Sequence, residues 1–406
     1  MLKSALKRAA VALVLLCVCA SLRADCMLKS GDRMVFLGDS ITEQRMYTRY
    51  AMDYFALRCP GAKIEFRNAG WGGDTAVGGF KRLTRDVLDL KPTVVSICYG
   101  MNDAGVTSYK QEIYDRYIGA MKDAITELRK HHIRVVLLTP GCVDESRSTK
   151  LVGYNDTLGR FAQQLADFAA KEDIPIFNIQ KAMLDVQTRA KASDPGFVMI
   201  NDGVHPGQLG HVVMAYGLLS ALGCIDKASA LTIDAAAAKA TCDRCKVTGL
   251  EVTGDSIAFT RTDDALPAYF EDDTWSLLKY FPEIDEFDNY SLKVTGLKGG
   301  KWDLAVQGQS VGAYTSEELA NGVNLANAPG PWKQLGEEVN KLATKQQEIY
   351  YTRWRQISLG QIPDEAAAEK QALLDKMDSV IASAESQRIS KAAGPRGWQW
   401  TLKLAP

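Results

Sequence analysis

Between Arg33 and Leu222, short apolar runs alternate with longer amphipathic stretches, and this alternation constrains the fold more than any other feature of the chain. Such an order is typical of βαβ units. The runs are apolar on successive residues, as strands are when helices cover both faces of a parallel sheet. The predicted strands are Met34–Leu37, Ile64–Phe66, Thr93–Cys98, Ile133–Leu138 and Ile174–Phe177, and the predicted helices are 44–58, 76–90, 108–131, 151–172, 180–191 and 208–222. The sequence therefore predicts an α/β domain with a doubly wound, five-stranded parallel sheet.

The pattern changes after about Asp226, where an alanine-rich stretch from Ala228 to Ala240 precedes short β-like runs such as 290–295. At roughly 150 residues per domain, a chain of 406 residues is long enough for two or three domains. We divide the chain into a leader at 1–24, an α/β domain at 27–225, a linker and β-rich accessory unit at 226–328, and a helical hairpin with a C-terminal strand at 329–406.

The predicted hairpin consists of two long, highly charged stretches with helical patterning, 332–358 and 363–388, separated by Gly360 and Pro363. Apolar residues are interleaved with the charges, among them Leu342, Ile349, Trp354 and Ile357. A helix with such an apolar stripe buries it against a partner. We expect the hairpin to pack on the α/β domain or to cap its cleft, with self-association as the alternative.

The leader carries Lys3, Lys7 and Arg8 before an apolar run from Ala9 to Ala20. This pattern predicts a cleaved signal peptide and a secreted or periplasmic protein. The alternative is a membrane anchor, but about a dozen apolar residues are fewer than the roughly 20 that span a bilayer, so we expect no stable membrane insertion. With 48 basic and 49 acidic side chains, the chain has no net field that would attract nucleic acid.

Seven cysteines follow the leader, an odd number, so at least one thiol is unpaired or joins another chain. Cys242 and Cys245 form a Cys-x-x-Cys pair that suits half of a zinc site, a redox pair or part of a disulfide. Zinc requires four ligands, and no second cluster of ligands accompanies the pair. We expect a structural disulfide, with Cys224 as one candidate partner for this pair.

Four polar segments follow predicted strands or end the α/β domain. They are Gly38-Asp39-Ser40-Ile41-Thr42, Asn68-Ala-Gly-Trp-Gly-Gly-Asp-Thr75, Gly100-Met-Asn-Asp103 and Asp202-Gly-Val-His-Pro206. Open α/β sheets bind ligands at the carboxyl ends of their strands, so these segments are expected at one edge of the sheet. Together they offer a hydroxyl, backbone and amide donors, an imidazole and a carboxylate. We read Asp39 and Asp103 as hydrogen-bond acceptors that fix loops.

A serine hydroxyl needs a neighbouring base to become a nucleophile, and the chain has only four histidines. His131 and His132 lie between a charged helix and a strand and are predicted to face solvent. His211 lies on the next helix after His205 and is expected to pack or to form a hydrogen bond near the site. His205 is left as the base for Ser40.

Asp202 stands three residues before His205, where it can reach the imidazole Nδ1–H and stabilise the imidazolium. The alternative role for Asp202 is to fix a turn or cap a helix.

The four segments, in this order, resemble the sequence blocks of the SGNH hydrolases, also called GDSL-like lipases and esterases. The family's Ser, Gly, Asn and His correspond to Ser40, Gly73, Asn102 and His205. Gly73 is chosen over the neighbouring glycines because it directly precedes Asp74-Thr75. The resemblance covers about residues 31–222 and implies a flavodoxin-like SGNH fold for a catalytic domain at 27–225.

The resemblance also implies a reaction: esters are cleaved through an acyl-serine intermediate, with Ser40, Asp202 and His205 as catalytic residues. The oxyanion hole is formed by the backbone N–H of Ser40, that of Gly73 and the Asn102 amide. This chemistry requires no metal and no organic cofactor.

Secretion favours extracellular esters, so we expect a small-molecule or polysaccharide ester substrate and, most specifically, a carbohydrate O-acetylesterase. The alternatives are a lysophospholipase or thioesterase type of lipid esterase, and a catalytically inactive surface binding module. Trp71 is expected either to form the base of a sugar-binding site or to pack in the core. Trp398 and Trp400 are expected to alternate along a terminal β-strand rather than to form a carbohydrate platform.

Overall fold

Five parallel strands form the centre of the N-terminal half of the molecule, in the order β2-β1-β3-β4-β5. Their bounds are β1 Arg33–Gly38, β2 Glu65–Gly70, β3 Val94–Cys98, β4 Arg134–Leu138 and β5 Ile176–Phe177. β1, β3 and β4 are almost wholly buried, as their unbroken apolar runs predict. The predicted fold class is thus confirmed in this computed structural model, which describes residues 25–406. The leader predicted at 1–24 lies outside the described residues.

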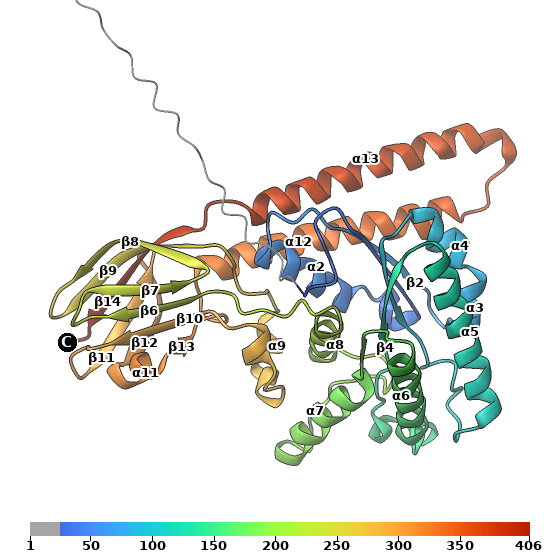
Figure 1. Cartoon of the computed structure of the whole chain (residues 1–406), viewed down its shortest axis with the longest axis horizontal. Coiled ribbons are helices and arrows are strands. Elements are labelled where there is room, and N and C mark those ends of the chain that lie inside the picture. The colour runs from blue at the N-terminus through green and yellow to red at the C-terminus, as the bar shows by residue number, and fades with distance from the viewer. Residues whose placement is uncertain (1–24) are drawn as a thin grey trace, which may run out of the picture.

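Helices flank this sheet in two layers. Their bounds are α1 Ser40–Glu43, α2 Met46–Arg58, α3 Ala76–Lys81, α4 Leu83–Asp86, α5 Gln111–Lys130, α6 Tyr154–Lys171, α7 Ile179–Ser193 and α8 Gln208–Ala221. α2 packs against α8, and α5 packs against α3. In Figure 1, α2 and α8 lie between the sheet and the β-rich half of the molecule, whereas α3 and α5 lie on its far side.

The helix predicted at 44–58 is confirmed as α2, which begins at Met46 because Arg45 adopts a left-handed backbone conformation (φ 64°) between α1 and α2. The one predicted at 76–90 breaks into α3, α4 and a short 3-10 turn, Leu88–Leu90. Hydrophobic periodicity continues across such breaks, so the sequence pattern alone does not reveal them.

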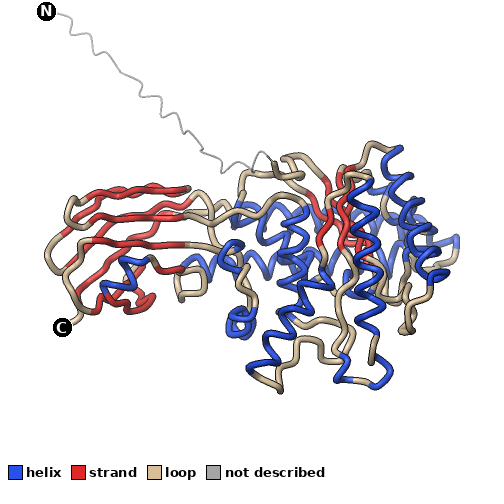
Figure 2. Tube along the Cα trace, turned by 60° about the horizontal axis from the view of Figure 1, so that its bottom comes forward, coloured by secondary structure: helices blue, strands red, loops and turns tan. Residues whose placement is uncertain are grey.

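The strands of the β-rich half (Figure 2) form two sheets. Buried side chains from both sheets belong to one hydrophobic core. One sheet has the order β13-β10-β6-β7 and the other β12-β11-β14-β9-β8. The strands are β6 Ala230–Asp234, β7 Lys239–Asp243, β8 Cys245–Val252, β9 Ser256–Asp263, β10 Ser291–Thr295, β11 Lys301–Val306, β12 Gln309–Thr315, β13 Val323–Asn324 and β14 Gly397–Leu404. Short helices α9 Asp272–Leu277, α10 Ile284–Phe287 and α11 Ser316–Asn321 join them. The alanine-rich stretch forms β6, a turn and the start of β7.

The C-terminal strand β14 lies in the middle of its sheet, antiparallel to both β9 and β11. Trp398 and Trp400 alternate along it and are buried, as the period-two pattern predicts. The Trp400 ring stacks on Trp332 at the start of the hairpin, with centroids 5.4 Å apart. β14 follows the hairpin in sequence, yet it completes the sheet of the β-rich half.

The helical hairpin consists of α12 Pro331–Tyr351, a π-helical extension Thr352–Ser358, and α13 Ala367–Ala392. α12 packs against α2 and β2, so the hairpin runs back along the α/β half from the β-rich half (Figure 1). The Trp354 indole is buried and donates to Asp86 Oδ1 at 3.1 Å. The prediction that the hairpin packs on the α/β domain is confirmed by these contacts.

Hydrogen bonds and an ion pair at the end of α2 join the α/β half to the β-rich half. The Leu57 carbonyl accepts hydrogen bonds from the Leu266 N–H at 3.1 Å and from Arg396 Nη1 at 3.0 Å. The next side chain, Arg58, forms a fully buried ion pair with Asp288 at 3.0 Å. The α2 helix therefore contributes to the junction as well as to the α/β core.

The disulfide joins Cys26 to Cys224, so the expectation that Cys224 pairs with Cys242 or Cys245 was wrong. The Met27 N–H donates to the Leu222 carbonyl at 2.8 Å, which places Cys26 beside the end of α8. Cys242 and Cys245 are free thiols in the β-rich half. In residues 25–406 no helix is long and apolar enough to cross a membrane, and no cluster of metal-ligating side chains is found.

Candidate active site

Ser40 stands at the carboxyl end of β1, as the first residue of the short helix α1. The turn into this helix is tight, because a Cβ at Gly38 would lie 2.2 Å from Thr42 Oγ1 and 2.8 Å from the Cys98 carbonyl. Asp39 caps α1 by accepting a hydrogen bond from the Ile41 N–H at 3.0 Å. The strand-to-helix turn thus fixes the position of Ser40.

Ser40, His205 and Asp202 form a continuous hydrogen-bonded chain. Ser40 Oγ lies 2.8 Å from His205 Nε2, and His205 Nδ1 lies 2.7 Å from Asp202 Oδ2. The other carboxylate oxygen of Asp202 accepts from the backbone N–H groups of His205 at 2.7 Å and Val204 at 2.9 Å. Asp202 therefore both fixes its loop and contacts the imidazole of His205.

Burial alone would raise the pKa of Asp202, but the hydrogen bonds from the His205 backbone and imidazole and from the Val204 N–H hold that pKa below its ordinary value. The Asp144 N–H donates to the Gly203 carbonyl at 2.9 Å, and this bond holds the loop that carries Asp202 and His205. Gly203 has φ 88°, and a Cβ there would lie 2.5 Å from the Leu151 side chain. Because its pKa is lowered, Asp202 is a carboxylate at neutral pH, and the contacts of Gly203 hold its loop in place.

Gly73 and Asn102 lie on the two loops that follow β2 and β3. The Trp71 N–H donates to the Gly38 carbonyl at 3.0 Å, which holds the first loop against the turn before Ser40. Gly73 has φ 72°, in the left-handed region that favours glycine, and its N–H makes no hydrogen bond within the described chain. Asn102 Nδ2 donates to the Asp74 carbonyl at 2.8 Å, leaving its second amide N–H for another acceptor.

Asp39 and Asp103 are buried beneath these loops. Asp103 accepts from the Ala76 N–H at 2.9 Å and from the Gly100 N–H at 3.1 Å, so it joins the loops that carry Gly73 and Asn102. Burial, reinforced by the mutual proximity of the acidic groups, raises the pKa of Asp39 to about 7, and burial raises the pKa of Asp103 to about 6. Both serve as acceptors for backbone N–H groups, in agreement with their predicted loop-fixing role.

The other three histidines lie where the sequence predicted. His131 and His132 are exposed at the end of α5. His211 is buried on α8, stacks on Tyr47 and bonds through Nε2 to Gln44 Oε1 at 2.9 Å. Only His205, of the four, contacts Ser40.

A cleft of about 360 Å³ opens in front of Ser40. Its lining is wholly polar or aromatic: Ser40, Glu43, Gln44, Arg45, Asp202, His205 and Tyr351. Tyr351 comes from the end of α12, so the hairpin contributes directly to the wall of the cleft. The sequence did not identify Glu43, Gln44, Arg45 or Tyr351 as site residues, because polar and aromatic residues at or near helix ends carry no motif that distinguishes them from a solvated surface.

Trp71 is covered by neighbouring side chains. The Arg355 guanidinium lies 3.4 Å from its ring centroid, and Trp354 makes an edge contact at 6.0 Å. The guanidinium of Arg85 lies 5.5 Å from the same centroid. These contacts favour the packing role of Trp71 over a platform for a sugar ring.

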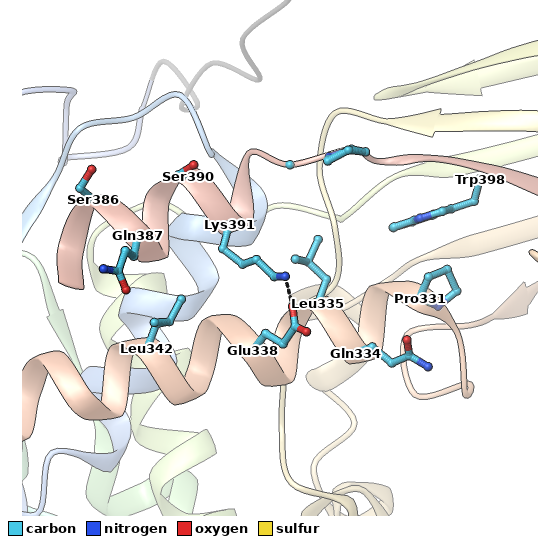
Figure 3. A pocket seen from close by; sticks show the side chains of 12 residues that line it. Pro331, Gln334, Leu335, Glu338, Leu342, Ser386, Gln387, Ser390, Lys391 and Trp398 are labelled. Atoms are coloured by element: carbon cyan, nitrogen blue, oxygen red, sulfur yellow. Dashed lines mark ion pairs between the residues drawn. The ribbon is translucent and has the colours of Figure 1, made fainter. Parts of the chain in front are cut away.

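A larger hollow of about 810 Å³ lies away from Ser40, where α12, α13 and the start of β14 meet (Figure 3). Leu335, Leu342 and Trp398 line it, and an ion pair between Lys391 and Glu338 crosses it. It contains none of the residues of the Ser40 cleft.

Residues 36–213 match the GDSL-like Lipase/Acylhydrolase family. The chain is 26% identical over 216 residues to an acetylxylan esterase from Geobacillus stearothermophilus, covering 48% of this chain and 95% of that protein. It is 23% identical over 210 residues to an isoamyl acetate-hydrolyzing esterase from Saccharomyces cerevisiae, covering 47% and 86% of the two chains.

A solved structure of a gut microbial diltiazem-metabolizing enzyme superimposes with a TM-score of 0.79 and 23% identity, covering 95% of this chain and 100% of that one. The likeness extends over the α/β half, the β-rich half and the hairpin, so the whole architecture recurs in that fold. The matched segment contains Ser40, Gly73, Asn102, Asp202 and His205. Residues 36–213 therefore form a GDSL-like lipase/acylhydrolase domain, the type of domain that SGNH hydrolases share, and the chain is a hydrolase of ester bonds.

Proposed function

We propose that the protein is an exported serine esterase that removes acetyl groups from carbohydrates, with Ser40 as nucleophile, His205 as general base and Asp202 as the residue that orients His205. The observation that carries this proposal is the hydrogen-bonded chain from Ser40 Oγ through the His205 ring to Asp202, at 2.8 and 2.7 Å. A serine is a competent nucleophile only when such a base accepts its proton.

In the first half of the reaction, Ser40 Oγ attacks the ester carbonyl while His205 Nε2 accepts its proton. The tetrahedral intermediate collapses when the imidazolium returns that proton to the leaving alcohol, and an acyl-Ser40 remains. Water then attacks the acyl group, with His205 again accepting the proton. Collapse of this second tetrahedral intermediate breaks the acyl–Ser40 bond, releases the carboxylic acid and returns the proton from His205 to Ser40 Oγ. Asp202 stabilises the imidazolium and keeps its Nδ1–H directed away from Ser40.

The negative oxygen of each tetrahedral intermediate needs donors that are already in place. The backbone N–H groups of Ser40 and Gly73 and the amide of Asn102 are proposed for this role. Support comes from the left-handed backbone of Gly73, whose N–H makes no bond within residues 25–406, and from the Asp74 carbonyl that fixes the Asn102 amide.

An acetyl ester is favoured over a lipid ester by the lining of the cleft. A long acyl chain needs a continuous apolar groove, whereas the cleft beside Ser40 is lined by hydroxyl, carboxylate, amide, guanidinium and imidazole groups. Two relatives are named for esters of acetate, one with a xylan as the alcohol. Polar groups of this kind suit the hydroxyls of a sugar.

Export rests on the predicted signal peptide and gains support from the Cys26–Cys224 disulfide. Disulfides persist in oxidising compartments and are uncommon in the cytosol.

The proposal is tested by measuring acetate release from acetylated xylan, acetylated pectin and acetylated monosaccharides, with lysophospholipids and acyl thioesters as the lipid arm. We expect acetate from one or more carbohydrate esters, no comparable lipid hydrolysis, and no release by Ser40→Ala. Hydrolysis of lipids in preference to sugar acetates contradicts the substrate class. A folded wild-type protein that hydrolyses none of these esters supports the inactive binding module instead.

A further inference from the structure

Arg45 stands in a strained position at the rim of the Ser40 cleft. It joins α1 to α2 with φ 64° and ψ 8°, a left-handed conformation that non-glycine residues adopt at an energetic cost. The break that it creates turns the chain sharply after Ser40–Glu43 and places Arg45 in the lining of the cleft. Strained residues of this kind concentrate at binding and catalytic sites.

The Arg45 guanidinium has no carboxylate partner. Within residues 25–406 it makes neither an ion pair nor a hydrogen bond, and its one contact of note is the Tyr351 ring, 4.3 Å from the guanidinium carbon. Four nearby arginines differ in this respect, since each forms an ion pair: Arg49 with Glu271, Arg82 with Asp74, Arg85 with Asp86, and Arg355 with Glu43.

The two acidic side chains of the cleft already have partners other than Arg45. Glu43 Oε1 accepts from Arg355 at 3.2 Å and from the Tyr351 hydroxyl at 3.1 Å, and Asp202 is bonded to His205. Arg45 is therefore an uncompensated positive charge in a concave site, held against an aromatic ring. A guanidinium without a paired anion can donate its N–H groups to an anionic group of a bound ligand. A carboxylate suits it best, because its two oxygens accept two parallel N–H hydrogen bonds.

The position of Arg45 indicates which part of the ester it meets. The cleft that it lines also contains His205 and Asp202, whereas Gly73 and Asn102 are absent from its lining. In the proposed reaction His205 returns a proton to the leaving alcohol, so the alcohol portion must lie on the side of His205. Arg45 lines the same side of the cleft and is therefore placed to contact the alcohol portion.

We propose that Arg45 binds a carboxylate on the alcohol portion of the substrate, and that the preferred substrate class is acetylated carbohydrate containing uronic acid. This inference rests on the proposed esterase function and specifies its substrate. Arg45 is a specificity-determining residue in this account: it touches the sugar and not the reacting carbonyl.

The test uses matched sets of three mono-acetylated methyl glycosides that differ only at C6: the glucoside, the glucosiduronate, and the methyl ester of that glucosiduronate. For each position of the acetyl group, kcat/KM is measured by acetate release with the wild type. We expect the glucosiduronate to be preferred over both neutral compounds on the order of tenfold, the range of a hydrogen-bonded charge pair, and we expect the preference to weaken at high salt.

Two variants probe Arg45. Arg45→Asn tolerates the left-handed backbone and removes the charge, so the preference for the glucosiduronate should disappear. Arg45→Lys keeps the charge without the planar fork and should keep part of the preference. Arg129→Gln is the matched control: it removes an equal charge from an exposed pair with Glu172 at the end of α5, and the preference should stay at the wild-type value.

The outcomes separate this inference from the function on which it rests. Hydrolysis of the neutral acetates without any advantage for the glucosiduronate, or an advantage that Arg45→Asn retains, overturns the role of Arg45 and leaves the esterase intact. If the protein releases acetate from none of these compounds, both the role of Arg45 and the proposed esterase function are overturned.

Discussion

The hydroxyl of Tyr351 donates a hydrogen bond to Glu43 at 3.1 Å, linking the end of α12 to the helix that begins with Ser40. Arg355 donates to the same oxygen of Glu43 at 3.2 Å and stacks on Trp71 in the loop that carries Gly73. The C-terminal hairpin thus supports both α1 and the neighbouring loop, although more than 300 residues of sequence lie between Glu43 and Tyr351.

Arg355→Met should therefore affect both stability and substrate binding. The substitution keeps an unbranched chain but removes the bond to Glu43 and the cation over Trp71, at a cost of about 1–3 kcal/mol. We expect a lower unfolding midpoint in urea and a raised KM. Arg353→Met is the matched control, because Arg353 is two residues away and pairs with Asp378 of α13 instead. Equal effects of both variants on KM would contradict the proposed support of the cleft.

Asn102→Ala tests the oxyanion hole. Removing one such donor commonly lowers kcat by about two to three orders of magnitude, because the donor is needed most when charge develops on the carbonyl oxygen. We expect a fall of that size in kcat with a smaller change in KM. The measurement is steady-state kinetics on an acetate ester, together with the far-UV circular dichroism spectrum. A folded variant with near wild-type kcat excludes Asn102 from the oxyanion hole.

Arg58→Met tests the junction between the halves. Arg58 and Asp288 are both fully buried, and Arg58 also donates to the carbonyls of Leu266 at 2.6 Å and Phe287 at 2.8 Å. Loss of one partner leaves a buried charge uncompensated, which costs about 3–5 kcal/mol. The exposed pair Lys298–Asp255 provides the control, since Lys298→Met should cost no more than about 1 kcal/mol. Indistinguishable urea midpoints for the two variants would refute this account of the junction.

The burial of His211 predicts that the folded protein loses stability in mild acid. Burial, with the positive charge of Arg49 as a smaller cause, lowers the pKa of His211 from 6.5 to about 3. Below about pH 6.5 the unfolded chain binds a proton that the folded chain excludes, so stability falls as the pH decreases toward about 3.

Lowering the pH from about 7 to about 5 should cost about 2 kcal/mol through this group alone. His211→Gln cannot titrate and can still donate to Gln44, so its unfolding midpoint should depend less on pH over that interval. An identical pH dependence in the wild type and the variant would show that His211 is not the responsible group.

The sequence predicted the α/β half well because its strands are apolar on consecutive residues and its polar segments follow them. The resemblance identified Ser40 and His205, which the fold brings within 2.8 Å of each other across 165 residues of sequence. The contact of Asp202 with His205 was predictable from local spacing alone, since the two residues stand three positions apart.

Features that depend on long-range packing were not predictable in this way. The pairing of Cys26 with Cys224 depends on where the N-terminal segment meets the end of α8. The central place of β14 depends on sheet order, which apolar alternation does not encode. Tyr351 faces the cleft only because α12 packs on α2, and nothing in the residues around Tyr351 signals that contact. Arg45 lines the cleft because of the left-handed break between α1 and α2, which the hydrophobic pattern does not reveal.

The nucleophilic role of Ser40 is tested most directly by a fluorophosphonate probe, which reacts covalently with an activated serine. The labelled protein is digested and the modified peptide is identified by mass spectrometry, with wild type, Ser40→Ala and His205→Ala compared. The account predicts a single adduct on Ser40 in the wild type, none in Ser40→Ala, and strongly slowed labelling in His205→Ala. A folded wild-type protein that does not label, or an adduct that persists in Ser40→Ala, would contradict it.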